Sequence, residues 1–369
     1  MSGPVAGRVV HLSTVHHSWD NRILNKECRA LAEAGIDTHL VISADEDRTG
    51  HGLSVHAIRR RGRLARLVVS QWEALQWLRR LRPAVLHVHD PELIPLMVLW
   101  GRLGRCRIIY DAHEDLVKQI ETKPYLRGRQ RVLARGAARA LVGLADRRCD
   151  AVVTVIDEIA QHFSTTRRGR PRPVVVVRNL PWVADFPPVS VRCNDPVAVY
   201  TGDISEERGF SRMVKAVEQV PGARLVLAGR SLVPTSRTGS HPEVEMLGLV
   251  PPGELPGILA RARLGLVLLD RLPNYAHSLP TKLVEYMASG IPFLATDFPY
   301  WRQLFEDVDA GVFVDVDDPA AVREALERLL TDPEECSRLG ANGRRAVEEH
   351  FGFDLDAARL VRLTRQLLG

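Results

Sequence analysis

Residues 277–296, HSLPTKLVEYMASGIPFLAT, predict a loop, a helix over about 280–289 and a strand that follows it. Ser278 is a suitable helix cap, and Pro280 in the first turn loses no hydrogen bond because the N–H groups there have no helical partner. Gly290, shortly before a second proline, is a typical stop signal. A helix placed directly before a short apolar strand is the repeating unit of α/β folds.

Glu285 lies among apolar residues of this expected helix, where a carboxylate needs a polar partner. Helical side chains lean toward the N-terminus, so Glu285 and Lys282 should lie near the end where free backbone N–H groups carry partial positive charge. An anionic or hydroxyl-bearing ligand fits such a place. The alternative is a Lys282–Glu285 pair on the helix surface, which would stabilise the helix by roughly 0.2–0.5 kcal/mol.

Length and composition indicate a globular protein of two domains. A chain of 369 residues is long for one compact core, and 45% of its residues are hydrophobic. No apolar run approaches the roughly eighteen residues that a membrane span needs, and the N-terminus lacks the layout of a signal peptide. We therefore expect a cytoplasmic protein. The five cysteines show no metal-finger spacing and are expected to be reduced and mostly buried.

Arginine is concentrated in two stretches, residues 59–66 and residues 127–139, in a chain of net charge +5. The first leads into Trp72 and Trp77. Either stretch could contact an anionic membrane surface or an acidic acceptor, and the alternative is a pair of solvated helix faces. Neither has the aromatic interleaving or fold signature of a nucleic-acid reader, so we expect no nucleic-acid partner.

Strands and helices are expected to alternate along the chain, as in parallel sheets covered on both faces. The expected strands are 9–12, 38–43, 85–88, 107–110, 151–155, 174–177, 197–201, 224–228, 264–268, 293–295 and 311–314. The expected helices are 23–34, 67–81, 93–101, 132–145, 211–217, 254–262, 281–289, 320–330 and 353–368. A proline-rich stretch, 181–196, interrupts the alternation and predicts a linker. Two α/β halves of this kind usually bind a ligand at the carboxyl ends of their strands.

Histidines and carboxylates gather after two neighbouring strands. His87 and His89 are on one face of a strand because side chains alternate, and Asp90 follows; YDAHED, which contains His113, ends the next strand. Imidazoles and carboxylates together could bind zinc, which allows a metal-dependent hydrolase or deacetylase using His87, His89 and His113. Histidines with a structural role are a second alternative. A single HxH is a weak signal, and we expect no bound metal and no cofactor.

The stretch 277–296 resembles the donor-site motif of the retaining, GT-B-fold glycosyltransferases of glycosyltransferase family 4. In that family two glutamates, separated by seven residues, span a loop and a helix start, and the second accepts hydrogen bonds from both hydroxyls of the nucleotide ribose. Glu285 matches the second glutamate, whereas His277 replaces the first, which contacts the donor sugar. The resemblance implies that the residues between these two bind the donor as well: Ser278, Leu279, Thr281 and Lys282.

Two further stretches carry the same resemblance. His113 in YDAHED matches a family histidine that reaches the donor sugar, and it is the implied catalytic residue. YTGDISEERGF, residues 200–210, is similar to the glycine-containing stretch whose two cations hold the donor diphosphate. Gly202 is its first glycine and Arg208 supplies one cation, while Asp203 occupies the position of the other. The loop HHSWDNR matches the acceptor-side loop, so we expect Asp20, Arg22 and the nearby Asp90 on the acceptor side.

The family fold implied is an α/β GT-B architecture, in which the parallel sheets of two Rossmann-like domains face a central cleft. We expect an acceptor-side domain over 1–185, a nucleotide-sugar-binding domain over 186–352 and a helix over 353–369 that crosses back to the first domain. The implied activity is transfer of a sugar from a nucleotide diphosphosugar to an acceptor with retained configuration, at the membrane periphery or in solution. A pseudoenzyme that binds nucleotide sugar without turnover is an alternative, because Asp203 and His277 depart from the family pattern.

Overall fold

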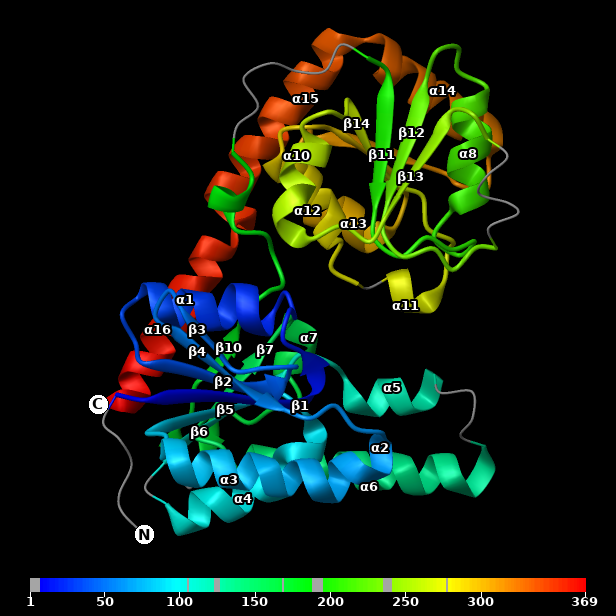
Figure 1. The fold of residues 1–369 in the computed structure, drawn as a ribbon. Helices are drawn as coiled ribbons and strands as arrows, with labels where there is room; N and C mark the ends of the chain where they lie inside the picture. Colours follow the sequence, from blue (N-terminus) through cyan, green and yellow to red (C-terminus); the bar gives the residue numbers. More distant parts are fainter. Residues whose placement is uncertain are drawn as a thin grey trace. The chain divides into compact units, whose positions relative to one another are not determined.

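The computed structural model describes residues 7–104, 106–122, 127–167, 169–187, 195–234, 241–276 and 278–369. The chain divides into two compact units, each with its own sheet (Figure 1). The first consists of Met1–Asn179 together with Asp354–Gly369, and the second of Leu180–Phe353. The chain therefore enters the second unit at Leu180, directly before the proline-rich stretch, and returns to the first at its last helix.

The first unit is built on an eight-stranded sheet with strand order β10-β7-β6-β5-β1-β2-β4-β3. All pairs are parallel except β3 with β4. The strands are β1 Val9–His17, β2 Thr38–Ser43, β3 Arg48–Gly50, β4 Leu53–Ile58, β5 Val85–Val88, β6 Arg107–Ala112, β7 Ala151–Thr154 and β10 Val174–Val176, and a separate antiparallel ribbon is formed by β8 Thr166–Arg167 and β9 Arg170–Pro171.

Helices cover both faces of this sheet, with α3, α4 and α6 along one face and α1 along the other (Figure 1). Buried residues of β1, β5 and β6 pack against the first group, and Leu40 and Ile42 of β2 pack against Ile23 and Cys28. The helical segments are η1 Ile23–Cys28, α1 Arg29–Glu33, α2 Arg63–Ala65, η2 Arg66–Ser70, α3 Gln71–Leu81, η3 Pro91–Leu93, α4 Ile94–Leu103, α5 Leu116–Thr122, α6 Gly128–Arg148, α7 Asp157–Ala160 and α16 Phe353–Leu368.

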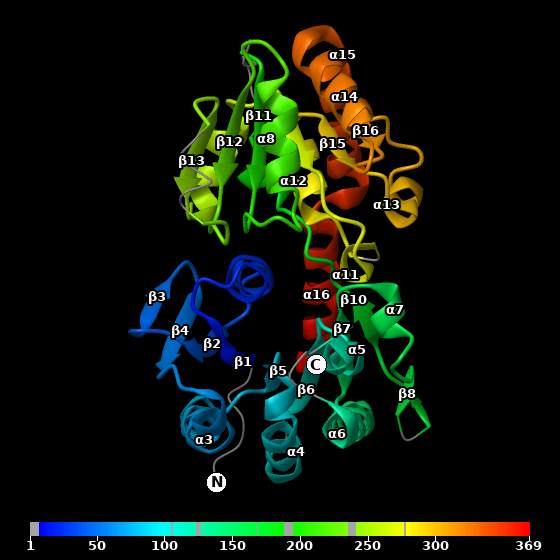
Figure 2. The same ribbon diagram turned by 90° about the vertical axis from the view of Figure 1, so that its right-hand side faces the viewer.

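The second unit contains a six-stranded parallel sheet with order β13-β12-β11-β14-β15-β16, and α8 lies across one face (Figure 2). Its strands are β11 Val197–Thr201, β12 Arg224–Ala228, β13 Val244–Gly248, β14 Leu264–Val267, β15 Phe293–Thr296 and β16 Gly311–Val314. Its helical segments are η4 Val183–Asp185, α8 Phe210–Glu218, η5 Pro252–Glu254, α10 Leu255–Leu259, α11 Pro273–Ala276, α12 Thr281–Ala288, α13 Pro299–Leu304, α14 Pro319–Thr331, α15 Pro333–Ala346 and η6 Val347–Phe351.

The predicted α/β class and the two parallel sheets are confirmed, and several local predictions need correction. β1 continues to His17, through residues that were expected to form a loop. β13 was missed because its residues are half-buried or exposed and show no apolar alternation. β4, α15 and the short helical segments α5, α7 and α13 were also missed. The expected helix 254–262 is only the short pair η5 and α10.

Two composition-based expectations can be compared with the structure. The cysteines at 28, 106, 149 and 336 are buried, as expected, and none of these four is in a disulfide, while Cys193 lies outside the described residues. Within the described ranges, no helix is both long enough and apolar enough to cross a bilayer.

Candidate active site

The start of α12 forms one end of the candidate donor site in the second unit. Its N-cap residue is Pro280, and no side chain caps the helix. The expectation that Ser278 caps it is wrong, because the Ser278 hydroxyl donates to the Tyr275 carbonyl oxygen (2.9 Å). The Ser278 carbonyl in turn accepts from Trp301 Nε1 (2.9 Å), which fixes the loop before the helix. The first turn of α12 therefore keeps backbone N–H groups that no side chain satisfies.

The apolar face of α12 holds the helix against the sheet. Leu283, Val284, Tyr286, Met287 and Ala288 are buried, as predicted, and Gly290 ends the helix with a φ of +70°. Side chains alternate along β14, so its glycine at 265 faces α12, and a Cβ there would lie 2.2 Å from the Tyr286 ring. The helix thus packs directly on the backbone of the sheet.

Gly202, directly after β11, allows the Lys282 side chain to approach the backbone. A Cβ at position 202 would lie 2.6 Å from Lys282 Cε and 3.1 Å from Nζ, and the φ of +119° at this residue also favours glycine. The Lys282 ammonium lies 5.8 Å from the centre of the Tyr200 ring. The sequence predicted both residues as donor-binding, and the structure brings them together.

Arg208 is a second cation beside this lysine. Burial alone would lower the pKa of Arg208, but its hydrogen bond to Tyr200 and the nearby Tyr275 and Asp203 outweigh that effect and raise it. Burial lowers the pKa of the Lys282 ammonium; Glu285 opposes this shift, and the positive charge of Arg208 adds to it. Gly209, with a φ of +85°, begins α8 at a place where a Cβ would collide with the Leu268 carbonyl, so the turn that carries Arg208 is sterically fixed.

Asp203, which occupies a basic position of the family motif, is paired with a cation in this chain. Its carboxylate accepts from Arg230 Nη2 (2.8 Å), and its carbonyl oxygen accepts from the Tyr200 hydroxyl (2.9 Å). The negative charge of Asp203 is therefore balanced by Arg230. Arg230 was not predicted from the sequence, and the signal available for it was its place shortly after the neighbouring strand β12.

In the first unit, the predicted catalytic residue His113 follows β6 next to a buried ionic pair. Its Nδ1 lies 3.6 Å from Asp111 Oδ2, and its side chain is 13% exposed. Asp111 accepts two hydrogen bonds from Arg22, to Oδ2 from Nε (3.1 Å) and to Oδ1 from Nη2 (3.0 Å). Burial alone would raise the pKa of Asp111, but Arg22 and His113 outweigh it and hold this pKa well below the usual range. A carboxylate fixed in this way can orient His113.

Arg22 and Asp90, which were expected on the acceptor side, are both largely buried. The Arg22 guanidinium is held by Asp111 and the Val177 carbonyl oxygen. Asp90 is also buried and accepts from the backbone N–H groups of Thr14 (2.5 Å) and Val15 (3.1 Å). Both residues position the chain around the site.

Asp20 is partly exposed and is held by His16, a residue that was not predicted from the sequence. His16 Nδ1 lies 2.9 Å from Asp20 Oδ2, and the His16 ring lies 5.2 Å from the His113 ring. Burial alone would lower the pKa of His16, but Asp20 and Asp90 outweigh this effect and raise it. The i,i+4 spacing of His16 and Asp20 was the signal available in the sequence.

The structure separates His87 from His113, which removes the metal-dependent hydrolase that needed both with His89. His87 and His89 have ring centres 4.7 Å apart and are fully buried with His11 and Glu27, whereas His113 groups with Asp111 and His89. His277, the residue predicted to contact the donor sugar, lies outside the described residues.

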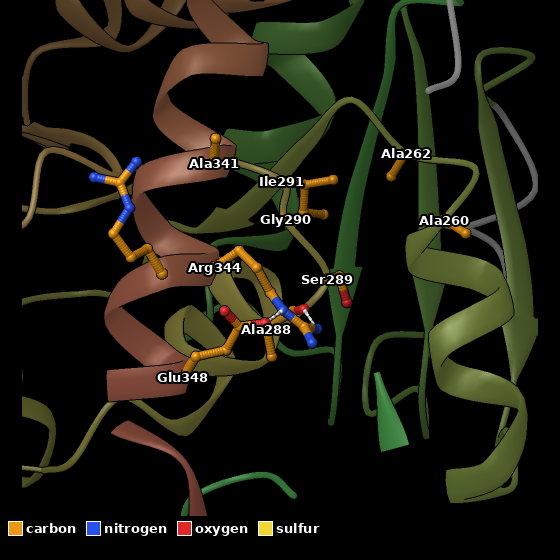
Figure 3. Close-up of a pocket in the computed structure, with 10 residues that line it drawn as sticks. Ala260, Ala262, Ala288, Ser289, Gly290, Ile291, Ala341, Arg344 and Glu348 are labelled. Carbon is orange, nitrogen blue, oxygen red and sulfur yellow. Dashed lines mark hydrogen bonds and ion pairs between the residues drawn. The ribbon is translucent and has the colours of Figure 1, made fainter. Parts of the chain in front are cut away.

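A pocket in the second unit lies at the C-terminal end of α12, away from the donor-site residues at the start of that helix (Figure 3). Arg344 crosses it and donates to the Ala288 carbonyl oxygen (2.6 Å) and to the Phe186 carbonyl, and its Nε pairs with Glu348 (2.6 Å). Because a cation at a helix C-terminus satisfies carbonyl groups there, this arrangement has a structural explanation.

Two family models match this chain, one in each unit. The family model described as Glycosyltransferase Family 4 matches residues 20–180, and the one described as Glycosyl transferases group 1 matches residues 185–346. The phosphatidyl-myo-inositol mannosyltransferase of Mycobacterium leprae is 24% identical, over 98% of this chain and 92% of its own length. Two other curated relatives, 24% and 29% identical, are each matched over only 42% of their length.

Two solved structures share the fold. Sucrose-phosphate synthase from Thermosynechococcus elongatus has a TM-score of 0.73 at 16% identity, with 99% of both chains covered. Anabaena Alr3699/HepE in complex with UDP and glucose has a TM-score of 0.70 at 14% identity, covering 97% of this chain and 99% of that one. With family models matching both units and the GT-B neighbours matching nearly the whole chain, this protein belongs to the GT-B glycosyltransferases of the family 4 type.

Proposed function

We propose that this protein transfers a sugar from a nucleotide diphosphosugar to an acceptor with retention of the anomeric configuration. The observation that carries the proposal is a pair of cations at the carboxyl end of β11: Lys282, which lies against Gly202, and Arg208, which is hydrogen-bonded to Tyr200 and whose positive charge acts on Lys282. In this proposal the second unit binds the donor, and the first unit supplies His113 and the acceptor side.

The two cations suit a diphosphate because their charges are already partly removed from water. The lowered pKa of Lys282 reflects burial and the repulsion from Arg208, and the negative charge of a bound diphosphate would offset both effects by attracting the ammonium. When the glycosidic bond breaks, negative charge grows on the leaving diphosphate, and fixed cations stabilise it without moving. Glu285, one helical turn after Lys282, would accept hydrogen bonds from the ribose hydroxyls.

His113, in the first unit, is the residue that we propose to act on the donor sugar. Asp111, fixed by Arg22, lies 3.6 Å from His113 Nδ1 and can orient the imidazole toward a sugar hydroxyl. We propose that the donor phosphate, on the same face, removes the acceptor proton, which gives retention without a nucleophile from the protein. No cofactor is required by this scheme, since the activated sugar already carries its leaving group.

The experiment is isothermal titration of the protein with UDP, the nucleotide present in the Anabaena structure. Lys282→Gln and Arg208→Gln should each weaken UDP binding about 10- to 100-fold, the scale for losing a charged hydrogen bond. Arg224→Gln is the matched control, because Arg224 begins β12 at the amino end of the strands, pairs with Asp195 (3.7 Å) and should change the affinity little. Equal affinities for all four proteins would refute the assignment of the diphosphate site.

Turnover is tested separately with a panel of nucleotide sugars, by following release of the nucleotide and the anomeric configuration of the product by NMR. Retention in the product supports the proposed chemistry, whereas inversion would contradict it. Tight UDP binding with no turnover of any donor, even with added acceptors, would favour the pseudoenzyme alternative.

We further propose that residues 59–72 contact an anionic membrane surface. Leu64 is 82% exposed, Val68 71% and Trp72 55%, and arginines flank them. Apolar side chains that enter the lipid interface beside basic groups are typical of peripheral membrane helices. In a sedimentation assay, the wild type should bind phosphatidylglycerol vesicles, and this binding should weaken at high salt. The Leu64→Glu variant should no longer bind them. Leu249→Glu, equally exposed at 78% but in the second unit, is the control. Equal sedimentation of both variants would refute this contact.

A further inference from the structure

Four side chains that could ligate a metal converge in the interior of the first unit, apart from the residues proposed to act on the sugar. His11 on β1 is paired in register with His87 on β5, and His89 follows directly after β5. Glu27 lies on η1, which covers this face of the sheet. All four residues have no exposed surface. Two neighbouring strands and one helix thus direct nitrogen and oxygen atoms to a single point.

The distances among these atoms suit a common ion. Glu27 Oε2 lies 3.9 Å from His11 Nδ1 and 3.8 Å from His87 Nε2, and His11 Nδ1 lies 2.9 Å from His89 Nε2. One atom from each of the four residues can be chosen so that all lie within 4.8 Å of one another. Ligands at Zn–N and Zn–O lengths of about 2.0–2.2 Å in a tetrahedron are about 3.3 Å apart. Small side-chain shifts would therefore complete the coordination.

Unsatisfied polar atoms are the second, independent observation. Among the described residues, buried atoms without a hydrogen-bond partner include both ring nitrogens of His87 and Oε2 of Glu27, whereas Glu27 Oε1 is paired with Arg22. Buried polar groups are nearly always satisfied, and each exception needs an explanation. An ion at the centre would bind Glu27 Oε2 and His87 Nε2 directly.

The balance of buried charges around Glu27 also favours a bound cation. Arg22 Nη2 lies 2.9 Å from Glu27 Oε1 and 3.0 Å from Asp111 Oδ1, so one buried cation serves two buried carboxylates. If both are ionised, one negative charge is left over, and an uncompensated buried charge is costly. Either a proton or a metal cation must balance it.

The surroundings already orient two of the ligands. His89 Nδ1 lies 2.9 Å from Asp111 Oδ2, an arrangement of carboxylate and imidazole that usually fixes a metal-binding histidine. Glu27 is brought into place by η1, whose N–H at Glu27 donates to the Arg22 carbonyl five residues earlier (3.0 Å). Such π-turns are frequent at functional sites.

We propose that His11, Glu27, His87 and His89 bind one divalent transition-metal ion, with Zn²⁺ the best match to three imidazoles and a carboxylate. Four protein ligands leave no open position, so the ion has a structural role, clamping β1, β5 and η1 together beneath the site. The proposed metal site differs from the expectation, drawn from the sequence, that no metal is bound. It also differs from the site of the hydrolase alternative, because His113 is not a ligand. It does not depend on the proposed transfer reaction.

The test is elemental analysis of the full-length protein, purified from zinc-supplemented culture and washed with EDTA to remove surface metal. We expect about one zinc ion per chain to remain in the wild type. The zinc content of His87→Gln and of Glu27→Gln should be at least tenfold lower. His56→Gln is the matched control: His56 is a partly buried histidine, hydrogen-bonded to His39 (2.8 Å) outside the cluster, and its metal content should equal the wild type.

The wild type alone can overturn the proposal, even if the variants fold poorly. Two results together would show that a proton, and not a metal ion, balances the charge of the cluster. The washed protein would hold less than about a tenth of an equivalent of any first-row metal, and its melting temperature would be the same after refolding with EDTA or with Zn²⁺. As a spectroscopic check, refolding with Co²⁺ should give the visible absorption of a tetrahedral ion in the wild type and in His56→Gln, and lose it in His87→Gln.

Discussion

The contact between His16 and Asp20 should make the stability of the first unit depend on pH. Burial alone would raise the pKa of Asp20, but the hydrogen bonds from His16 and from the Ile23 N–H lower it from 3.8 to about 2. A carboxyl whose pKa is lower in the folded state stabilises the protein above pH 3.8, and this contribution disappears as the pH falls to about 2. His16, whose pKa is raised, contributes below pH 6.5 and loses its contribution as the pH rises through its folded pKa.

We therefore predict that Asp20→Asn destabilises the protein most between about pH 4 and 6.5, by roughly 2 kcal/mol. The difference from the wild type should shrink as the pH approaches 2. Urea unfolding at a series of pH values measures it, with the exposed Asp45→Asn as the control. A difference that stays constant down to pH 2 would contradict the proposed ionic contact.

Glu285 gives a prediction for binding at the level of one side chain. If it accepts hydrogen bonds from the ribose, Glu285→Gln should weaken UDP binding by roughly 1.5–3 kcal/mol, because an ionised acceptor binds more strongly than an amide. A 2′,3′-dideoxy analogue of UDP should bind the wild type and the variant equally. A loss of equal size for both nucleotides would assign Glu285 to support of Lys282 rather than to the ribose.

At the level of elements, the last helix gives a prediction for stability. α16 belongs to the first unit, where Leu360 is fully buried and Asp356 accepts from Arg178 Nε (3.0 Å). Leu360→Ala should destabilise the protein by about 2–5 kcal/mol, the cost of removing a fully buried leucine side chain. Leu355→Ala, on the same helix but 41% exposed, should cost less than about 1 kcal/mol. Chemical denaturation compares the two, and similar losses would contradict the packing of α16.

The whole molecule gives a prediction about where nucleotide acts. UDP at 100 times its dissociation constant should stabilise the protein by about 2.7 kcal/mol. If the donor site lies mainly in the second unit, hydrogen exchange should slow at the start of α12 and after β11. Protection confined to residues of the first unit would reverse the proposed roles of the two units.

The sequence alone determined the repeating strand–helix pattern, because hydrophobic periodicity is a local property. The limits of β11, β12, β16 and α16 agree with the residues predicted, and so does the apolar face of α12. The stretches that contain Glu285, Lys282 and Arg208 could also be singled out in the sequence, because they are short and carry marked glycines, and their role in binding is still a prediction.

Only the tertiary structure decided which residues share a site in the first unit. The strand order β6-β5-β1 brings Asp111, His89 and His11 together although they are far apart in the chain. It also buries Arg22 and Asp90, which the sequence suggested would face an acceptor. Periodicity shows which face of a strand a side chain occupies, but not which strand lies beside it, because pairing in a parallel sheet depends on how the whole chain crosses over.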